Sequence, residues 1–425
     1  MKRIINLSGF IIGFSVTVFA QLTIEDCQTK ARENYPLIKK YDLIKQSKEY
    51  NLANASKAYL PQFQLNVRAT YQSEVTSIPI SIPGITIPDL KKDQYQAVME
   101  ASQMLWDGGA VRSQRKMTEA GSEVETQQVE VELYTLRERI NQLFFGILLF
   151  DMQLEQNQIL QDELQRNYAA IAASVEFGVA NRTDLDVVKV EQLNAKQIRI
   201  QIQTMRNAFV EMLAIMTGEK PDKNVNLKRP AVNHLLENEM LSSVVKRPEI
   251  QLFDAQNNLF DSQKNLIKSA YMPKVGLFLQ GGIGRPGLNM LSNEIKPFYI
   301  GGIRLSWNFG ALYTQKNDLR KIEINKNAVN VQKDIFLYNI NLTTTREIQE
   351  IKRLNEIMKQ DDEIITLREN IRKSAEAKVA NGTLTVTELM REISQESWAR
   401  QTKATHEIDL LIAIYNLKNM KNSDE

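Results

Sequence analysis

Three glycines match the spacing of a cofactor-binding motif. The phrase "GGIGRPG" places Gly282, Gly284 and Gly287 as in G-x-G-x-x-G, in which the last glycine opens a helix that holds a pyrophosphate. Here Pro286 lies inside the phrase, and no β-α-β pattern follows it. We therefore interpret the phrase as a connection between two strands, and we expect no cofactor.

Residues for metal binding or covalent catalysis are poorly placed as well. The two histidines, His234 and His406, are far apart, and the single Cys27 is not spaced to join either of them in a metal site. The pair Asp361 and Asp362 interrupts an apolar stripe and is most simply a solvated helix face. Since no nucleophile and base stand out together, we expect neither a metal site nor an enzyme.

Charge and the N-terminus indicate where the chain acts. A net charge of +2, without a basic stripe, argues against a nucleic-acid partner. Lys2 and Arg3 precede an apolar run that ends in small residues, which predicts a secretory signal peptide over residues 1–20; a retained N-terminal anchor is the alternative. No other segment has eighteen continuous apolar residues, so any membrane crossing has to be built from strands.

A phrase near the N-terminus recurs in the second half of the chain. Residues 58–67 read "AYLPQFQLNV", and residues 270–279 read "AYMPKVGLFL". Proline ends a helix and holds the preceding residue extended, so Pro61 and Pro273 each mark a junction from helix to strand.

Three further landmarks recur in the same order and at a similar separation. They are the helix-leading prolines Pro36 and Pro248, the tryptophans Trp106 and Trp307, and the phrases "VANRT" and "VANGT". The chain is therefore an internal duplication. We predict a first repeat over 21–217, a connector over 218–246 and a second repeat over 247–425.

Each repeat is predicted to contain two strands. Residues 62–72 alternate apolar and polar side chains, which is typical of a strand with one apolar face. The expected partner strand covers 94–106, and the second repeat offers 274–282 and 298–309. The apolar faces of the first pair are formed by Phe63, Leu65, Val67, Ala69 and Tyr71, and by Tyr95, Ala97, Met99 and Ala101.

Long helices follow the strands in both repeats. The first is predicted over 110–176. The second ends near 379, within a stretch of 71 residues (311–381) that is free of glycine and proline. Each is followed by a turn and a returning helix, over 185–217 and 386–419. A heptad spacing indicates a coiled coil of helices packed side by side. Its apolar members are Leu136, Ile140, Leu143, Ile147, Phe150 and Leu154.

Four strands are too few to close a barrel, and an unpaired strand edge is too costly in lipid. If the strands cross a membrane, several chains must therefore pool them. The alternative is a soluble β-sandwich between coiled coils.

The order of these elements resembles the TolC-like outer-membrane efflux channels over nearly all of the mature chain. The phrases that carry the resemblance are "YLPQ" and "YMPK", "LWDGG", and the turns "FGVANRTDLDVV" and "KVANGTLTVTEL". The resemblance implies a mainly α-helical homotrimer in the outer membrane of a Gram-negative bacterium. Long hairpins would form a periplasmic α-barrel, and twelve pooled strands a shared transmembrane β-barrel in contact with outer-membrane lipid.

The implied function is a passive exit duct of a tripartite efflux or type I secretion system. Its partners would be a periplasmic adaptor (membrane fusion) protein and an inner-membrane transporter. The alternatives are that the chain is itself a periplasmic adaptor or a structural coiled-coil protein of the cell envelope. An adaptor would need one hairpin beside compact β domains, whereas this sequence has two hairpins.

The two hairpin turns are the expected docking site for the adaptor, because small residues let another backbone approach closely. Ala180 stands where the family usually has glycine, and an arginine that some members carry in the second turn is absent. The docking residues are predicted to be Gly178, Asn181, Arg182, Thr183, Asn381, Gly382 and Thr383.

Acidic residues follow both turns, and around a symmetric tube they would form rings that attract cations. The candidate gate acids are Asp184, Asp186, Glu388 and Glu392. Arg182 can instead pair with one of them and hold neighbouring hairpins together. The alternative is that the acids simply favour helix N-termini.

Overall fold

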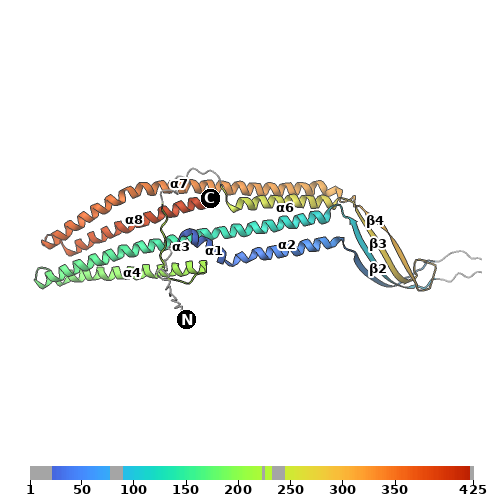
Figure 1. Cartoon of the computed structure of the whole chain (residues 1–425), viewed down its shortest axis with the longest axis horizontal. Coiled ribbons are helices and arrows are strands. Elements are labelled where there is room, and N and C mark those ends of the chain that lie inside the picture. The colour runs from blue at the N-terminus through green and yellow to red at the C-terminus, as the bar shows by residue number, and fades with distance from the viewer. Residues whose placement is uncertain (1–21, 77–89, 223–224, 232–244, 422–425) are drawn as a thin grey trace, which may run out of the picture. The chain divides into compact units, whose positions relative to one another are not determined.

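The computed structural model describes residues 22–76, 90–222, 225–231 and 245–421, and it shows the expected order of elements twice (Figure 1). The expected signal peptide, His234 and parts of the connector lie outside the described residues. The first repeat contains α1 (Ile24–Asn34), the 3-10 turn η1 (Pro36–Lys39), α2 (Lys40–Ser56), η2 (Lys57–Tyr59), β1 (Gln62–Tyr71), β2 (Asp93–Trp106), α3 (Ala110–Glu176) and α4 (Arg182–Thr217). The second contains α6 (Pro248–Ala270), β3 (Lys274–Arg285), β4 (Lys296–Ser306), α7 (Leu312–Ala380) and α8 (Val386–Lys421). The predicted duplication is confirmed, and its exact boundaries remain a prediction.

Local signals account for the helix ends. Thr23 caps α1: its Oγ1 accepts a hydrogen bond from the Asp26 backbone N–H at 3.1 Å, and Asp26 Oδ2 accepts one from the Thr23 N–H at 3.3 Å. Pro248 occupies the start of α6, where its missing N–H costs nothing. These two helices therefore begin where the sequence supplies a helix-start signal.

The strands form one antiparallel sheet in the order β1-β2-β3-β4. Its register aligns apolar side chains on one face across all four strands, so the faces expected for β1 and β2 are confirmed. β3 runs on to Arg285 instead of ending at Gly282, so "GGIG" belongs to a strand. The apolar face is formed by Phe63, Leu65, Val67, Ala97, Met99, Leu279, Ile283, Tyr299 and Ile303.

The opposite face of the sheet is mainly polar. Gln64 of β1 lies opposite Glu100 of β2, which lies opposite Gln280 of β3. Gln280 Nε2 donates to Glu100 Oε2 at 2.6 Å, and Arg304 of β4 lies 3.3 Å from the other Glu100 oxygen. The sheet thus separates one apolar surface from one polar surface.

The chain divides into two compact units that cut across the repeats. One contains residues 1–35, 133–245 and 342–425; the other contains 36–132 and 246–341, including the sheet. In the first unit, the heptad residues Leu136, Ile140, Leu143 and Ile147 are buried, as the coiled-coil pattern predicts. Ile140, Leu143 and Ile147 belong to a core to which α1, α4 and α8 also contribute.

Among the helices of the described ranges, none combines the length and the apolar character needed for a membrane crossing.

Candidate functional site

The turn of the first hairpin is a Schellman motif. Val179 N–H donates to Ser174 O at 2.8 Å, and Gly178 N–H donates to Val175 O at 3.0 Å. Gly178 has φ +74°, and a Cβ built there meets no atom within 4 Å. Phe177 and Val179 are 80% and 77% exposed, so this turn also presents apolar side chains. The docking prediction from sequence did not include these two residues.

The second hairpin ends its long helix in the same way. Thr383 N–H donates to Lys378 O, and Gly382 N–H donates to Val379 O, both at 2.9 Å. Gly382 has φ +69° and equally open surroundings. The seven expected docking residues are all exposed. They fall on the two turns of one compact unit (Figure 1). An apolar cluster that α3, α4, α7 and α8 share lies beside these turns.

Two of the four candidate gate acids cap the returning helices. Asp184 Oδ2 accepts a hydrogen bond from the Asn181 backbone N–H at 3.1 Å. Glu388 Oε2 accepts one from the Thr385 N–H at 3.1 Å, and Thr385 Oγ1 accepts one from the Glu388 N–H at 3.2 Å. The hydrogen bonds from Thr385, the backbone one first, lower the pKa of the Glu388 carboxyl. Both acids thus have a local structural role.

The other two gate acids differ from each other. Glu392 lies 3.5 Å from Arg368 and 3.1 Å from Arg391, and only 15% of its side chain is exposed. Asp186 is exposed, as is Arg182, and within the described part of the chain neither makes an ion pair. An ion pair of Arg182 with a neighbouring copy remains a prediction.

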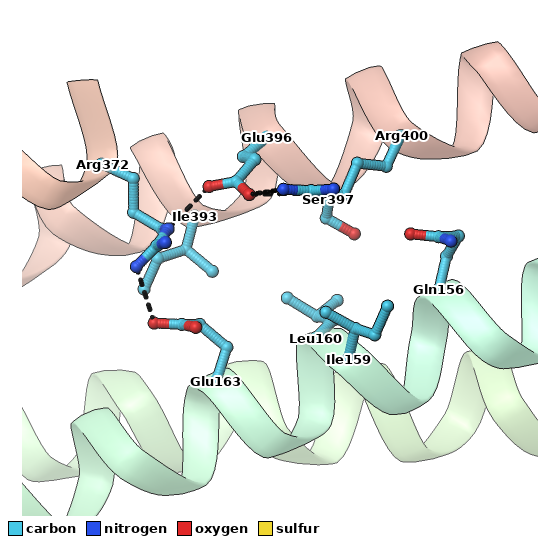
Figure 2. Close-up of a pocket in the computed structure, with 9 residues that line it drawn as sticks. All are labelled: Gln156, Ile159, Leu160, Glu163, Arg372, Ile393, Glu396, Ser397 and Arg400. Carbon is cyan, nitrogen blue, oxygen red and sulfur yellow. Dashed lines mark hydrogen bonds and ion pairs between the residues drawn. The ribbon is translucent and has the colours of Figure 1, made fainter. Parts of the chain in front are cut away.

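Charged side chains from both hairpins meet around Arg372, in a group that we call the Arg372 cluster (Figure 2). The Arg372 guanidinium of α7 lies 3.0 Å from Glu163 of α3, 2.7 Å from Glu376 of α7 and 2.6 Å from Glu396 of α8. Arg400 of α8 lies 2.7 Å from the other Glu396 oxygen. The cluster therefore connects the first hairpin with the second inside one unit.

This cluster was not predicted from the sequence, although two of its ion pairs are visible there. Arg372 with Glu376, and Glu396 with Arg400, have the i,i+4 spacing of helix-surface pairs. Only the structure shows that Glu163 joins them from a helix more than 200 positions away. The side chains of Arg372, Glu163 and Glu396 are 13%, 12% and 8% exposed, so each charge depends on its partners.

One part of the sequence interpretation is wrong. Asp361 is buried, and its Oδ2 lies 2.9 Å from Nδ1 of His406, so it does not belong to a solvated face. Asp362 is exposed and pairs with Lys403, as a surface residue does. In the described ranges, no group of three or more His, Cys, Asp or Glu side chains is arranged to hold a metal ion.

The duplicated hairpins and the sheet with one apolar face define a TolC-like channel fold, and comparison with known proteins agrees. Residues 28–219 match the family described as outer membrane efflux protein. The resemblance drawn from the sequence is therefore confirmed over these residues, and the location in the outer membrane is confirmed with it. The family is one of efflux proteins and not of enzymes. None of the curated protein sequences matches the chain.

Solved structures share the fold over nearly the whole chain. The outer-membrane channel OprN is 12% identical with a TM-score of 0.67, and the match covers 93% of this chain and 89% of OprN. VceC, an outer membrane protein from Vibrio cholerae, is 12% identical with a TM-score of 0.64, and coverage is 93% and 95%. The MtrE outer membrane channel of Neisseria gonorrhoeae, in its open state, is 13% identical with a TM-score of 0.64, and coverage is 93% and 88%.

Proposed function

We propose that the chain is one subunit of a homotrimeric exit duct in the outer membrane of a Gram-negative bacterium. The duct conducts substrates passively for a tripartite efflux or type I secretion system. A periplasmic adaptor protein docks at its hairpin turns, and an inner-membrane transporter supplies the energy. The two hairpins of the chain do not fit the alternative of an adaptor with a single hairpin.

The observation that carries this proposal is the sheet. Its apolar face crosses four strands, and among the described residues β1 and β4 each have a neighbour on one side only. Because all neighbouring strands are antiparallel, β4 of one copy can continue the same pattern with β1 of the next. Three copies then pool twelve strands without an edge, with the apolar face toward lipid and the polar face toward the passage.

Cross-linking between copies tests this arrangement. Paired cysteines at Val67 of β1 and Ile303 of β4, in a Cys27→Ala background, should join chains into dimers and trimers with a short bis-maleimide. The matched control places cysteines at Ala97 and Ile283, which lie opposite each other within one chain, and should give no ladder. If the first cysteine pair gives only monomers, although this variant is as abundant in the membrane as the control, the shared sheet is contradicted.

The turn acids are proposed to attract cations into the periplasmic end of the duct. Asp186→Asn combined with Glu388→Gln should lower the cation preference of the channel in planar bilayers, measured by reversal potential, while trimer yield stays the same. Since the Glu388 pKa is lowered, its carboxylate and its share of the cation preference persist below the usual glutamate range and are lost only as pH falls through that lowered pKa.

A control variant tests whether the effect on selectivity belongs to the turn acids. The control Glu356→Gln removes an exposed charge that lies 2.6 Å from Lys359 on α7, well away from the turns in sequence, and should leave selectivity unchanged. An unaltered reversal potential in the double variant would mean that Asp186 and Glu388 do not attract cations, and that Glu388 serves only as a helix cap.

A further inference from the structure

We propose that the polar face of the sheet is a contact surface for organic anions that carry an apolar body. The consequence for transport, that the membrane end of the duct favours anionic substrates, rests on the proposed function. The surface itself is formed by the four strands of one compact unit. The acids of the hairpin turns belong to the other unit.

Basic side chains outnumber acids on this face. Residues that lie opposite each other in the register share a face, as do alternate residues of one strand. Within the four described strands, the acid of the polar face is Glu100. The basic side chains of that face are Arg68, Lys274, Lys296 and Arg304. On the apolar face, by contrast, the charges of Asp93 and Arg285 pair with each other.

The carboxylate of Glu100 cannot balance all of these cations, because its two oxygens already have partners. One oxygen accepts a hydrogen bond from Gln280 Nε2 at 2.6 Å. The other lies 3.3 Å from the guanidinium of Arg304. One acid is thus shared between an amide and a single basic side chain.

The other basic side chains of the face keep most of their charge. The guanidinium of Arg68 is exposed and has a neutral neighbour, Gln96 Oε1, at 3.5 Å. Within the described part of the chain, neither Arg68 nor Lys274 makes an ion pair. Lys296 lies 2.7 Å from Glu294, but both side chains are largely exposed, so this pair is weak. The face therefore has a net positive charge, which raises the local concentration of anions.

Two phenyl rings supply an apolar contact on the same face. Phe298 of β4 lies opposite Gly282 of β3, and Phe278 of β3 lies opposite Gly302 of β4. A Cβ built at Gly282 would lie 3.0 Å from the ring of Phe298, and one built at Gly302 would lie 3.2 Å from the ring of Phe278. Because glycine has no side chain, each ring can lie against the neighbouring strand. Both rings remain partly exposed.

Arg304 places a positive charge beside one of these rings. Its guanidinium carbon lies 4.6 Å from the centre of the Phe278 ring, and its side chain is 55% exposed. A guanidinium that stacks on a ring can still donate its in-plane N–H groups to an oxyanion. A sulfonate or carboxylate with an apolar body therefore finds both an apolar contact and a charged partner here, whereas a cation of the same shape is repelled.

In the proposed trimer, this surface is repeated around the passage, because the polar face of each sheet is turned inward. Rings of arginine or lysine are a recurrent feature of anion-conducting pores. The acids of the hairpin turns have the opposite sign. The duct is therefore expected to attract cations at its periplasmic end and organic anions at its membrane end.

Equilibrium dialysis of the purified full-length protein in non-ionic detergent tests the surface without requiring conduction. The probes are naphthalenesulfonate and naphthylmethylammonium, which share a ring system and differ in charge, and protein-free micelles serve as the blank. The wild type should bind the anion severalfold more tightly than the cation. Arg68→Gln combined with Arg304→Gln should remove this preference. The control Lys359→Gln, which removes an exposed basic charge on α7, should bind both probes as the wild type does.

Two further variants keep the test decisive if the double arginine variant does not fold. Arg68→Gln alone has no ion pair to lose and should weaken anion binding severalfold. Phe278→Leu combined with Phe298→Leu keeps every charge and should also weaken it, because the rings are lost. Equal binding of both probes to the wild type, or unchanged anion binding in Arg68→Gln, would overturn the contact surface.

Planar bilayers separate this inference from the proposed function. There, Arg68→Gln should move the reversal potential toward cation selectivity, and an unchanged potential would overturn the preference of the duct for anions. A protein that prefers the anionic probe but forms no channels would refute the duct and support the surface. Channels formed by a protein without that preference would refute only the surface.

Discussion

Leu65→Asp combined with Val67→Asp should remove trimers from the outer membrane. Both side chains belong to the apolar face of the sheet and are 67% and 72% exposed in the single chain. Facing lipid, each aspartate costs somewhat less than the about 2–4 kcal/mol of an arginine near the midplane. Each change also loses the apolar contact that it replaces. We expect a drop in cross-linked trimer on the order of tenfold or more.

A change of similar size on the other face provides the control. Gln64→Glu combined with Asn66→Asp adds two charges to the same strand, on its polar face. This variant should assemble nearly as the wild type does, because those positions face the passage in the proposed trimer. Equal loss of trimer in both variants would mean that charge in β1, and not its lipid-facing position, causes the defect.

Gly382→Trp should abolish export while leaving the protein in the membrane. A Cβ at Gly382 meets no atom of its own chain within 4 Å, so the ring has room in the isolated subunit. With φ at +69°, a side chain there costs about 1–2 kcal/mol, which a long hairpin tolerates. The large effect arises from the adaptor, whose close approach to the turn the ring blocks. The two measurements are export of a substrate by intact cells and the abundance of the variant protein in the membrane.

Gly382→Asn separates backbone strain from bulk. Asparagine adopts the left-handed conformation more readily than most residues and adds a small side chain. We expect it to retain most export, and we expect Gly178→Trp at the first turn to resemble Gly382→Trp. Export that persists in both tryptophan variants would show that the turns are not where the adaptor binds.

Much of the fold could be predicted because its signals are local. Proline positions, strand alternation and the heptad of α3 each depend on a few neighbouring residues. They placed both ends of α3, and the start of α6 at Pro248, where the structure shows them. The connection expected after residue 282 was placed too early, since glycines within β3 allow close packing of strands as well as a turn. A Cβ at Gly284 would lie 3.2 Å from the carbonyl oxygen of Tyr95 in β2.

The site was predicted less completely, for a different reason. The turn residues were found because glycine at a positive φ leaves a sequence signal. Asp184 and Glu388 were also found, but the sequence does not distinguish an acid that caps a helix from one that lines a passage. The burial of Asp361 against His406 was missed because it depends on how α7 and α8 face each other.

The sequence by itself determined the duplication, the long hairpins and a strand with one apolar face, since these follow from the spacing of residues along one element. Only the tertiary structure decided which distant side chains meet. The four-strand register extends the apolar face across both repeats, and Arg372 brings Glu163 to Glu376 and Glu396. The physical reason is that burial and pairing of charges depend on helix rotation and packing between elements, which no single segment encodes.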